Sequence, residues 1–150
     1  ALKNHTTFGI EILDIDFFKS VNDTYGHIGG DHYLTAVADL LYKITEDYKD
    51  VFAARYGGDE FVLVYYNKTL DEVNEIMEQL KQSTNSVKLP EISKVGVDHV
   101  TLSQGCCNRV PEPMNRLWDY LSCADNILYE VKKKGKNNYK VLDCFETAEV

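Results

Sequence analysis

The sequence predicts an α+β fold, in which a central mixed and largely antiparallel sheet is flanked by helices. Three features favour this fold class. β-type apolar runs and stretches of helical period interleave without a steady βαβ repeat, a hairpin is predicted in the middle of the chain, and 150 residues suit one core. We therefore expect residues 1–150 to form a single domain.

The first half of the chain is predicted from the spacing of its apolar residues. A strand begins at residues 8–12, where Phe, Ile and Ile alternate with other residues, and apolar residues recur at helical spacing along residues 28–48. Two β-type runs follow at residues 51–54 and 61–66. Because a Gly-Gly pair lies between these runs, they are predicted to form a hairpin.

The second half continues the alternation of helices and strands. Thr69 and Glu72 form a capping-box pattern that opens a helix with an apolar stripe, and residues 83–96 are predicted to form a loop. The remaining predicted elements are a strand over residues 99–107, a long helix after Pro113 and a closing strand over residues 138–142.

The hairpin connection carries the most informative residues. Gly57 and Gly58 tolerate positive φ and leave no side chain to obstruct a ligand close to the backbone. The adjacent carboxylates of Asp59 and Glu60 suit a hard divalent cation such as Mg²⁺, which shares its coordination with substrate phosphates. Taken alone, the same residues also fit a tight turn with solvated acids.

A second acidic cluster favours the metal site over the plain turn. The first strand ends in Asp14, Ile15 and Asp16, so its carboxylates reach the sheet edge where they could meet the hairpin tip. The chain then becomes polar and helical. The amides of Phe17, Phe18 and Lys19 are therefore expected at a helix N-terminus, which favours a phosphate group.

Five blocks of this chain resemble the GGDEF family of diguanylate cyclases. They agree with the family in residue type, order and approximate spacing over residues 8 to about 140. The blocks are DIDFFK at 14–19, ND-x-x-GH-x-x-GD at 22–31, GGDEF at 57–61, T-x-S-x-G at 101–105, and AD-x-x-LY-x-x-K-x-x-GKN at 124–137.

The resemblance implies a fold related to nucleotidyl cyclases and the polymerase palm. It also implies condensation of two GTP molecules into cyclic di-GMP with release of two pyrophosphates. Asp14, Asp59 and Glu60, with the carbonyl of Ile15, are the expected ligands of Mg²⁺ or Mn²⁺. Asp59 and Glu60 are the expected catalytic acids, and sequence does not separate ligand from base between them. For Asp16 we expect only a role in supporting its neighbours.

Substrate contacts follow from the same resemblance. Asn22 and Asp31 match the two residues of the family that recognise guanine. The chemical reason is that a carboxylate accepts the N1 and N2 hydrogens of guanine, which adenine does not offer. Lys132 and Lys136 match the lysines that contact phosphate, beside Phe17, Phe18 and Lys19. The two lysines would share a face if the last helix continues past Gly135. Without the resemblance, the two lysines would be interpreted as basic residues that stabilise the C-terminus of a helix.

The chain carries one set of site residues, whereas the product has two identical bonds. We therefore expect two domains to face each other across a two-fold axis.

Two departures from the family are expected to matter. The inhibitory R-x-x-D site is absent, because Tyr48 and Val51 fill its positions, and a shift by one residue gives Asp47 and Asp50 without an arginine. The usual lead-in segment is also missing, so the chain is expected to come from a larger protein with an N-terminal sensor or dimerisation module.

Composition limits the remaining alternatives. The net charge of −8 argues against a general nucleic-acid partner. No apolar run approaches ~18 residues and no signal-peptide pattern opens the chain, so we expect no membrane contact by this domain and a cytoplasmic location, although the parent could be membrane-anchored. The four cysteines, without C-x-x-C spacing, are expected to be reduced structural thiols. The rival functions are a silent GGDEF receptor for GTP or cyclic di-GMP, a cyclase with another product, and a structural module.

Overall fold

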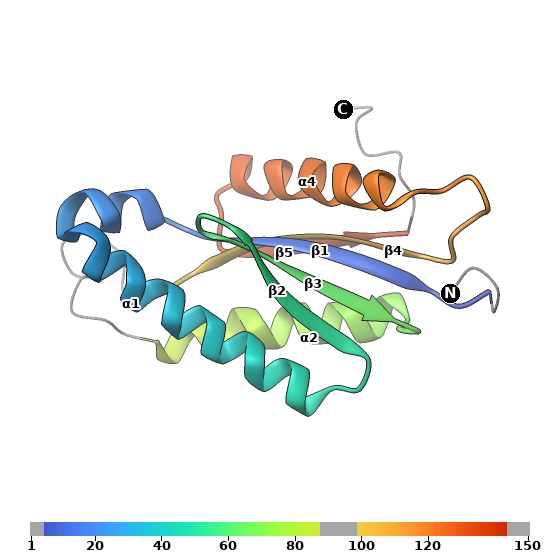
Figure 1. Ribbon diagram of the computed structural model, residues 1–150, viewed down its shortest axis with the longest axis horizontal. Coiled ribbons are helices and arrows are strands. Elements are labelled where there is room, and N and C mark those ends of the chain that lie inside the picture. Colours follow the sequence, from blue (N-terminus) through green and yellow to red (C-terminus); the bar gives the residue numbers. More distant parts are fainter. Residues whose placement is uncertain (1–4, 88–98, 144–150) are drawn as a thin grey trace.

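The computed structural model describes residues 5–87 and 99–143 and confirms the α+β fold (Figure 1). Within these residues, five strands form one sheet in the order β2-β3-β1-β4-β5. β4 and β5 are parallel, and the other neighbouring pairs are antiparallel. The strands are β1 (Phe8–Ile15), β2 (Val51–Gly57), β3 (Glu60–Tyr66), β4 (Leu102–Arg109) and β5 (Asn138–Leu142).

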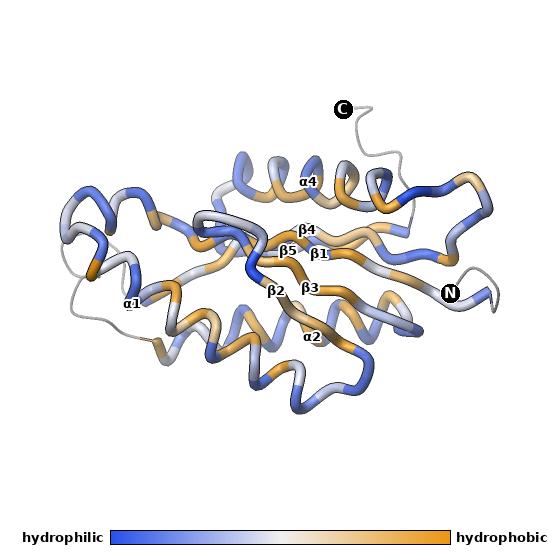
Figure 2. The backbone as a smooth tube through the Cα atoms, viewed as in Figure 1, coloured by the Kyte–Doolittle hydropathy of each residue, from blue (hydrophilic) through white to orange (hydrophobic). Residues whose placement is uncertain are grey.

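The helices cover the sheet on both faces. Helices α1 (Phe18–Asp47) and α2 (Leu70–Ser83) lie on one face, a short 3₁₀ turn η1 (Thr84–Ser86) follows α2, and α4 (Leu117–Lys133) lies on the other face (Figure 1). Figure 2 shows the apolar side of α4 turned toward the sheet. None of the helices in the described part of the chain is long and apolar enough to cross a membrane.

Strand β1 lies at the centre of the sheet because both of its faces are apolar. Leu13 packs into the large core under α1 and α2, whereas Ile12 packs with Ala124 and Leu128 of α4. The sequence of a strand buried on both faces is a nearly continuous apolar run, without alternation of apolar and polar residues. This central position brings the end of β1 between β3 and β4, where the acidic residues of the sequence motifs gather.

Three predicted boundaries differ from the structure. The helix expected over 28–48 and the helical segment after the first acids are one helix, α1, bent at Gly26, whose φ of 72° and ψ of −166° are not helical. The strand expected over 99–107 begins instead at Leu102 and ends at Arg109. Helix α4 ends at Lys133 and does not continue past Gly135. The predicted loop 83–96 falls partly outside the described residues.

The capping box that the sequence predicts is present at the start of α2. The hydroxyl of Thr69 accepts a hydrogen bond from the amide of Glu72, and the Glu72 carboxylate accepts one from the amide of Thr69. Thr69→Ala removes one partner from an otherwise unpaired helix amide, and is expected to lower the free energy of unfolding by about 1 kcal/mol. Urea denaturation tests this value, and Thr69→Ser, which keeps the hydroxyl, should remain close to the wild type.

Close backbone packing fixes α4 on β4. A Cβ atom on Gly105 would lie 2.5 Å from the amide nitrogen of Leu128 and 2.6 Å from the carbonyl oxygen of Ala124. Only glycine permits this approach, which explains its place in the T-x-S-x-G strand. Helix α4 is thereby held at a short, fixed distance from the sheet.

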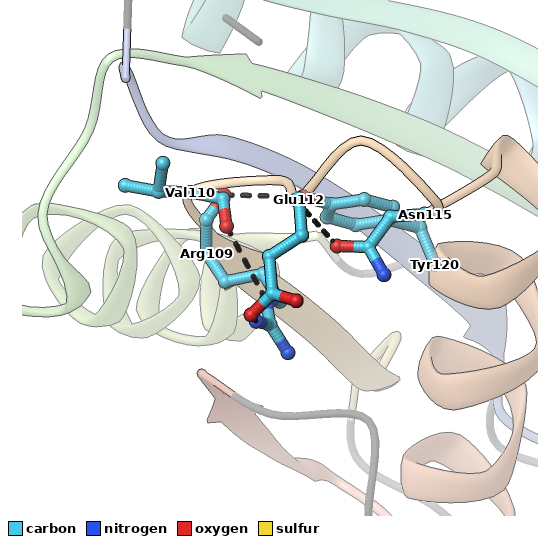
Figure 3. A network of polar contacts seen from close by, with 5 residues as sticks. All are labelled: Arg109, Val110, Glu112, Asn115 and Tyr120. Atoms are coloured by element: carbon cyan, nitrogen blue, oxygen red, sulfur yellow. Dashed lines mark hydrogen bonds and ion pairs between the residues drawn. The ribbon is translucent and has the colours of Figure 1, made fainter.

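The connection from β4 to α4 is held by polar contacts (Figure 3). Arg109 forms an ion pair with Glu112 at 3.2 Å, and the Glu112 amide donates to the Asn115 side chain at 2.7 Å. The hydroxyl of Tyr120, in the first turn of α4, donates to the carbonyl of Arg109 at 3.1 Å. These bonds set the direction in which α4 returns across the sheet.

The neighbouring cysteines of β4 lie on opposite faces of the sheet. Cys106 packs in the core beneath α1 and α2, and Cys107 packs with Cys123 of α4. All three side chains are buried. Burial raises the pKa of the Cys106 thiol well above its ordinary value. These cysteines are therefore packing residues, while Cys144 lies outside the described residues.

Candidate active site

The two acidic motifs meet at one end of the sheet, as the sequence predicts. Asp14 pairs with Glu60 in the register of β1 and β3, and the Ile15 amide donates to the carbonyl of Asp59 at 3.3 Å. The first turn of α1 starts beside the same hairpin tip (Figure 1). Residues that lie far apart in the chain therefore form one local surface.

The hairpin tip owes its shape to its glycines. Gly57 and Gly58 have φ values of 155° and 53°, and the positive φ of Gly58 lies in the left-handed region that favours glycine. Arg55 fixes the turn, because its Nε and Nη2 atoms donate to the carbonyl of Gly58 at 3.1 and 2.6 Å. No atom lies within 4 Å of a Cβ added at either glycine, so the surface beside the tip is open.

Asp14 is a buried carboxylate with one oxygen bound and one oxygen without a partner. Its Oδ2 atom forms an ion pair with Lys132 of α4, while Oδ1 is buried and accepts no hydrogen bond. Burial, followed by a hydrogen bond and the charge of Asp59, raises the pKa of Asp14 to about 7 against the opposing effect of Lys132. Burial lowers the pKa of Lys132, but the hydrogen bond with Asp14 and the charges of Asp14, Asp59 and Glu60 together outweigh burial, so the pKa of Lys132 is raised.

This arrangement fits a divalent cation. Two carboxyl groups held together and a buried oxygen without a partner are what a hard cation with oxygen ligands would satisfy. Across residues 5–87 and 99–143, no three His, Cys, Asp or Glu side chains are arranged to close on one ion. Asp14 and Asp59 are thus the acids that the structure brings together, and Mg²⁺ commonly completes its shell with water and phosphate.

Glu60 lies opposite Asp14 in the register of β1 and β3. Burial raises the pKa of the Glu60 carboxyl, against the opposing charge of Lys132. Asp125 and Asp59 add to the rise. Glu60 is therefore close to both the acids and the lysine, on the side of β3 that faces α4.

A hollow of about 220 Å³ collects most of the residues that the sequence singled out. It lies at the end of β1, between the first turn of α1, the hairpin tip and the end of α4. Its lining comprises Asp14, Ile15, Asp16, Phe17, Phe18, Lys19, Ser20, Asp59, Lys132 and Lys136. The predicted metal and phosphate residues other than Glu60 thus share one cavity.

The N-terminus of α1 faces this hollow without a competing side chain. Phe17, at the cap position, has a φ of 65°, and neither a side-chain cap nor an acidic residue occurs in the first turn. The first amides of the helix are therefore available to an anion, as predicted. Lys19 is 92% exposed at its side chain and forms a loose ion pair with Asp23 at 3.6 Å.

Lys136 reaches the hollow by a turn rather than along a helix. Gly135 and Lys136 have φ values of 125° and 64°, and the Lys136 amide donates to the carbonyl of Val131 at 3.2 Å. Its ammonium lies 4.6 Å from the centre of the Phe17 ring. Lys132 and Lys136 therefore line one cavity, although the condition under which the sequence placed them together, a continuing helix, is wrong.

The expected guanine contacts, Asn22 and Asp31, do not line the hollow. The bend at Gly26 folds α1 so that the side chain of Asn22 covers Gly30, where a Cβ atom would lie 2.2 Å from the Asn22 oxygen. Asp31 follows Gly30 and is exposed. The Asn22 side chain therefore lies against the backbone one residue before Asp31.

Comparison with known proteins agrees with this geometry. Residues 1–138 match the family described as "Diguanylate cyclase, GGDEF domain". The chain belongs to the GGDEF family. The motif blocks described above are therefore family motifs, and the five-stranded sheet is the family's fold.

Relatives of this GGDEF domain carry names that point to one activity. The chain is 35% identical over 127 residues to diguanylate cyclase VdcA of Vibrio cholerae, covering 84% of the chain and 36% of that protein. It is 34% identical to diguanylate cyclase A of Treponema denticola, covering 87% and 34%. The chain therefore spans about a third of the length of these curated relatives.

Solved structures show the same likeness. The GGDEF domain of DgcB from Caulobacter crescentus, in complex with c-di-GMP, matches with a TM-score of 0.82 at 30% identity, covering 94% of this chain and 81% of that chain. The active GGEEF domain of a diguanylate cyclase from Vibrio cholerae matches with a TM-score of 0.77 at 27% identity, covering 93% and 85%.

The sequence did not predict how this GGDEF domain uses Asp16. Its carboxylate accepts hydrogen bonds from the hydroxyls of Thr101 and Ser103, each at 2.7 Å, and from the amide of Asn137 at 2.9 Å. The T-x-S-x-G block did indicate that the two hydroxyls lie on the same side of a strand, because residues two apart on a strand face the same side. Without the neighbouring strand, that block gave no partner for the hydroxyls.

Proposed function

We propose that this domain is a diguanylate cyclase, which condenses two GTP molecules into cyclic di-GMP and releases two pyrophosphates. The observation that carries the proposal is the single hollow in which Asp14 and Asp59 face the N-terminus of α1 and the lysines 132 and 136. The names of the relatives support the same activity.

The positive groups of the hollow would hold the triphosphate of GTP. The open amides at the start of α1 favour phosphate oxygens, and Lys132 and Lys136 supply full charges on the opposite side. A magnesium or manganese ion, held by Asp14 and Asp59 with the carbonyl of Ile15, would polarise the α-phosphate and neutralise developing charge. Asn22 and Asp31, further along α1, would then read the guanine.

The reaction itself needs a proton acceptor and an aligned pair of groups. The 3′-oxygen of one GTP forms a bond to the α-phosphorus of the other, the bond from that phosphorus to the bridging oxygen breaks, and pyrophosphate leaves. The hydroxyl proton goes to a carboxylate at the attack site. We favour Asp59 over Glu60 for this role, because Asp59 lines the hollow beside Asp14 and Glu60 does not.

Product identification tests the proposal. The protein is incubated with GTP and Mg²⁺, and the nucleotides are separated by chromatography. Cyclic di-GMP with pyrophosphate supports the cyclase. Intact GTP would instead support a GGDEF domain that only binds GTP or cyclic di-GMP, and a mixed product would indicate a cyclase with relaxed base selection.

A two-fold pair of domains is required by the product, since each domain has one set of site residues and the product has two identical bonds. Activity per subunit is therefore expected to rise with protein concentration until the pair is saturated. Initial rates over a wide dilution range, with sedimentation of the same samples, measure this. A rate strictly proportional to protein concentration, from a species that sediments as a monomer, would contradict the paired mechanism.

Feedback through an R-x-x-D product site is not expected. The positions of that motif have packing roles here, since Val51 is 3% exposed in the core and the Tyr48 hydroxyl donates to Gln79 of α2. Added cyclic di-GMP should leave the initial rate unchanged. Strong inhibition that disappears on changing Asp47 or Asp50, the acids of the alternative frame, would overturn this expectation. We expect the domain to work in the cytoplasm, where GTP is available.

A further inference from the structure

Asp16 differs from Asp14 although both belong to the same D-x-D block. Asp16 is 4% exposed, and both of its carboxylate oxygens already accept hydrogen bonds, from Thr101, Ser103 and the Asn137 amide. The Asp16 amide also donates to the carbonyl of Thr101 at 3.0 Å. Asp14, by contrast, keeps one buried oxygen without a partner. The second acid of the block is bound to the protein, and the first is open to a ligand.

The bond from Asn137 joins Asp16 to the loop that follows α4. In this loop, Lys136 and Asn137 have φ values of 64° and 46°. Such conformations are uncommon for residues other than glycine and persist where surrounding contacts hold them. The carboxylate of Asp16 supplies such a contact at Asn137, one residue after Lys136.

The same loop delivers a charge to the hollow. The Lys136 ammonium lies over the ring of Phe17, which follows Asp16 in the chain. Asp16 therefore ties the segment that carries Lys136 to the segment that carries Phe17. Because both residues line the hollow, the distance between the lysine and the N-terminus of α1 depends on this bond.

We propose that Asp16 is a positioning residue, which fixes the loop after α4 so that Lys136 faces the triphosphate, and that it is not a metal ligand. The inference rests on the proposed function for the identity of the anion. A metal ion at Asp16 would compete with the hydrogen bonds from two hydroxyls and an amide, whereas a positioning residue keeps all three. The two roles make different demands on the side chain, because positioning needs an acceptor oxygen while a metal ligand also needs the negative charge.

Binding of a GTP analogue with a methylene bridge between its α- and β-phosphates tests the proposal. Dissociation constants are measured with Mg²⁺ for Asp16→Ala, Lys136→Gln and the double variant. Each single change is expected to weaken binding by about tenfold, the size expected for one charge-assisted contact. The double variant should bind no more weakly than either single variant, because without the tie Lys136 no longer reaches the analogue. Effects that multiply in the double variant would overturn the proposal.

Asp16→Asn separates positioning from metal binding. Its amide oxygen can still accept the Asn137 amide hydrogen, and its amino group can donate to a hydroxyl, so affinity is expected to stay within about threefold of the wild type. Weakening as severe as that of Asp16→Ala, restored by excess Mg²⁺, would instead assign Asp16 to the metal.

Amide exchange gives a readout that does not depend on the nucleotide or on Asp16→Ala folding. By nuclear magnetic resonance, the Asn137 amide should exchange slowly with solvent in the wild type and in Asp16→Asn. Fast exchange in the folded wild type would refute the tie. If the wild type neither binds the analogue nor converts GTP, the proposed function fails, and the exchange result still decides whether Asp16 holds the loop.

Discussion

Asp59→Asn is expected to lower the rate of cyclic di-GMP formation by about 100-fold to 10,000-fold, the range over which removal of a general base or acid acts. The change keeps the size of the side chain and leaves the backbone bond from Ile15 to the Asp59 carbonyl in place. It removes the charge that would hold the metal or accept the proton. Initial rates at saturating GTP and Mg²⁺, followed by chromatography, measure the effect.

The fold should survive Asp59→Asn. The hydrogen bond and charge of Asp59 both act to raise the pKa of Asp14, so replacing that charge relieves repulsion at the hairpin tip. Thermal unfolding is expected to be unchanged or slightly raised. Asp39→Asn, the same change on an exposed part of α1, is the matched control and should leave the rate unaltered. A variant that keeps more than about a tenth of the wild-type rate would remove Asp59 from the chemistry. Recovery with Mn²⁺ or excess Mg²⁺ would assign it to the metal rather than to the proton.

Glu11→Gln is expected to stabilise the protein strongly at alkaline pH and little near pH 4. The Glu11 side chain is fully buried in β1, one oxygen accepts the hydroxyl of Tyr65, and the other has no partner. Burial raises the pKa of Glu11 to about 8 from the ordinary 4.5, against the lowering effect of the Tyr65 bond. Glu11 is therefore protonated in the folded protein at neutral pH.

The sign of the pH dependence follows from that difference. Below pH 4.5 both states hold the proton and Glu11 contributes nothing. Between pH 4.5 and about 8 the unfolded chain releases the proton while the folded protein keeps it, so stability falls as pH rises. At about 1.4 kcal/mol for each pH unit, the loss at pH 9 is on the order of 4 to 5 kcal/mol.

Urea denaturation of wild type and Glu11→Gln from pH 4 to pH 9 measures this loss. The two curves should converge at acidic pH and separate steadily above it, because glutamine has no charge to bury. Glu75→Gln on the exposed face of α2 is the matched control and should shift stability by less than about 0.5 kcal/mol at every pH. Parallel curves for Glu11→Gln and wild type would show that the carboxyl ionises without cost.

Much of the fold followed from sequence because local signals agreed with the tertiary structure. The capping box at Thr69, the hairpin around Gly57 and the apolar run of β1 each specify an element without distant partners. The start of α1 was less clear. Polar residues precede Gly26, so the apolar stripe that identifies a helix becomes regular only after the bend.

The site, like the fold, could be predicted only in part. Its residue types were visible in the motifs, but their partners depend on chain crossings. No local pattern reveals that Lys132 pairs with Asp14, or that one oxygen of Asp14 stays open while Asp16 is tied to Asn137. No local pattern reveals that Glu60, the neighbour of Asp59, pairs with Asp14 across the strands without lining the hollow.

The central position of β1 governs how late the cavity can form during synthesis of the chain. β1 is the first of the five strands to be made, yet Asp14 pairs with Glu60 on one side and Ser103 on the other, and its charge partner is Lys132. Contacts so distant in the chain form late and slow folding. The ribosome must release almost the whole domain before the cavity exists, and the unpaired edges of β1 are exposed to other chains until β4 arrives.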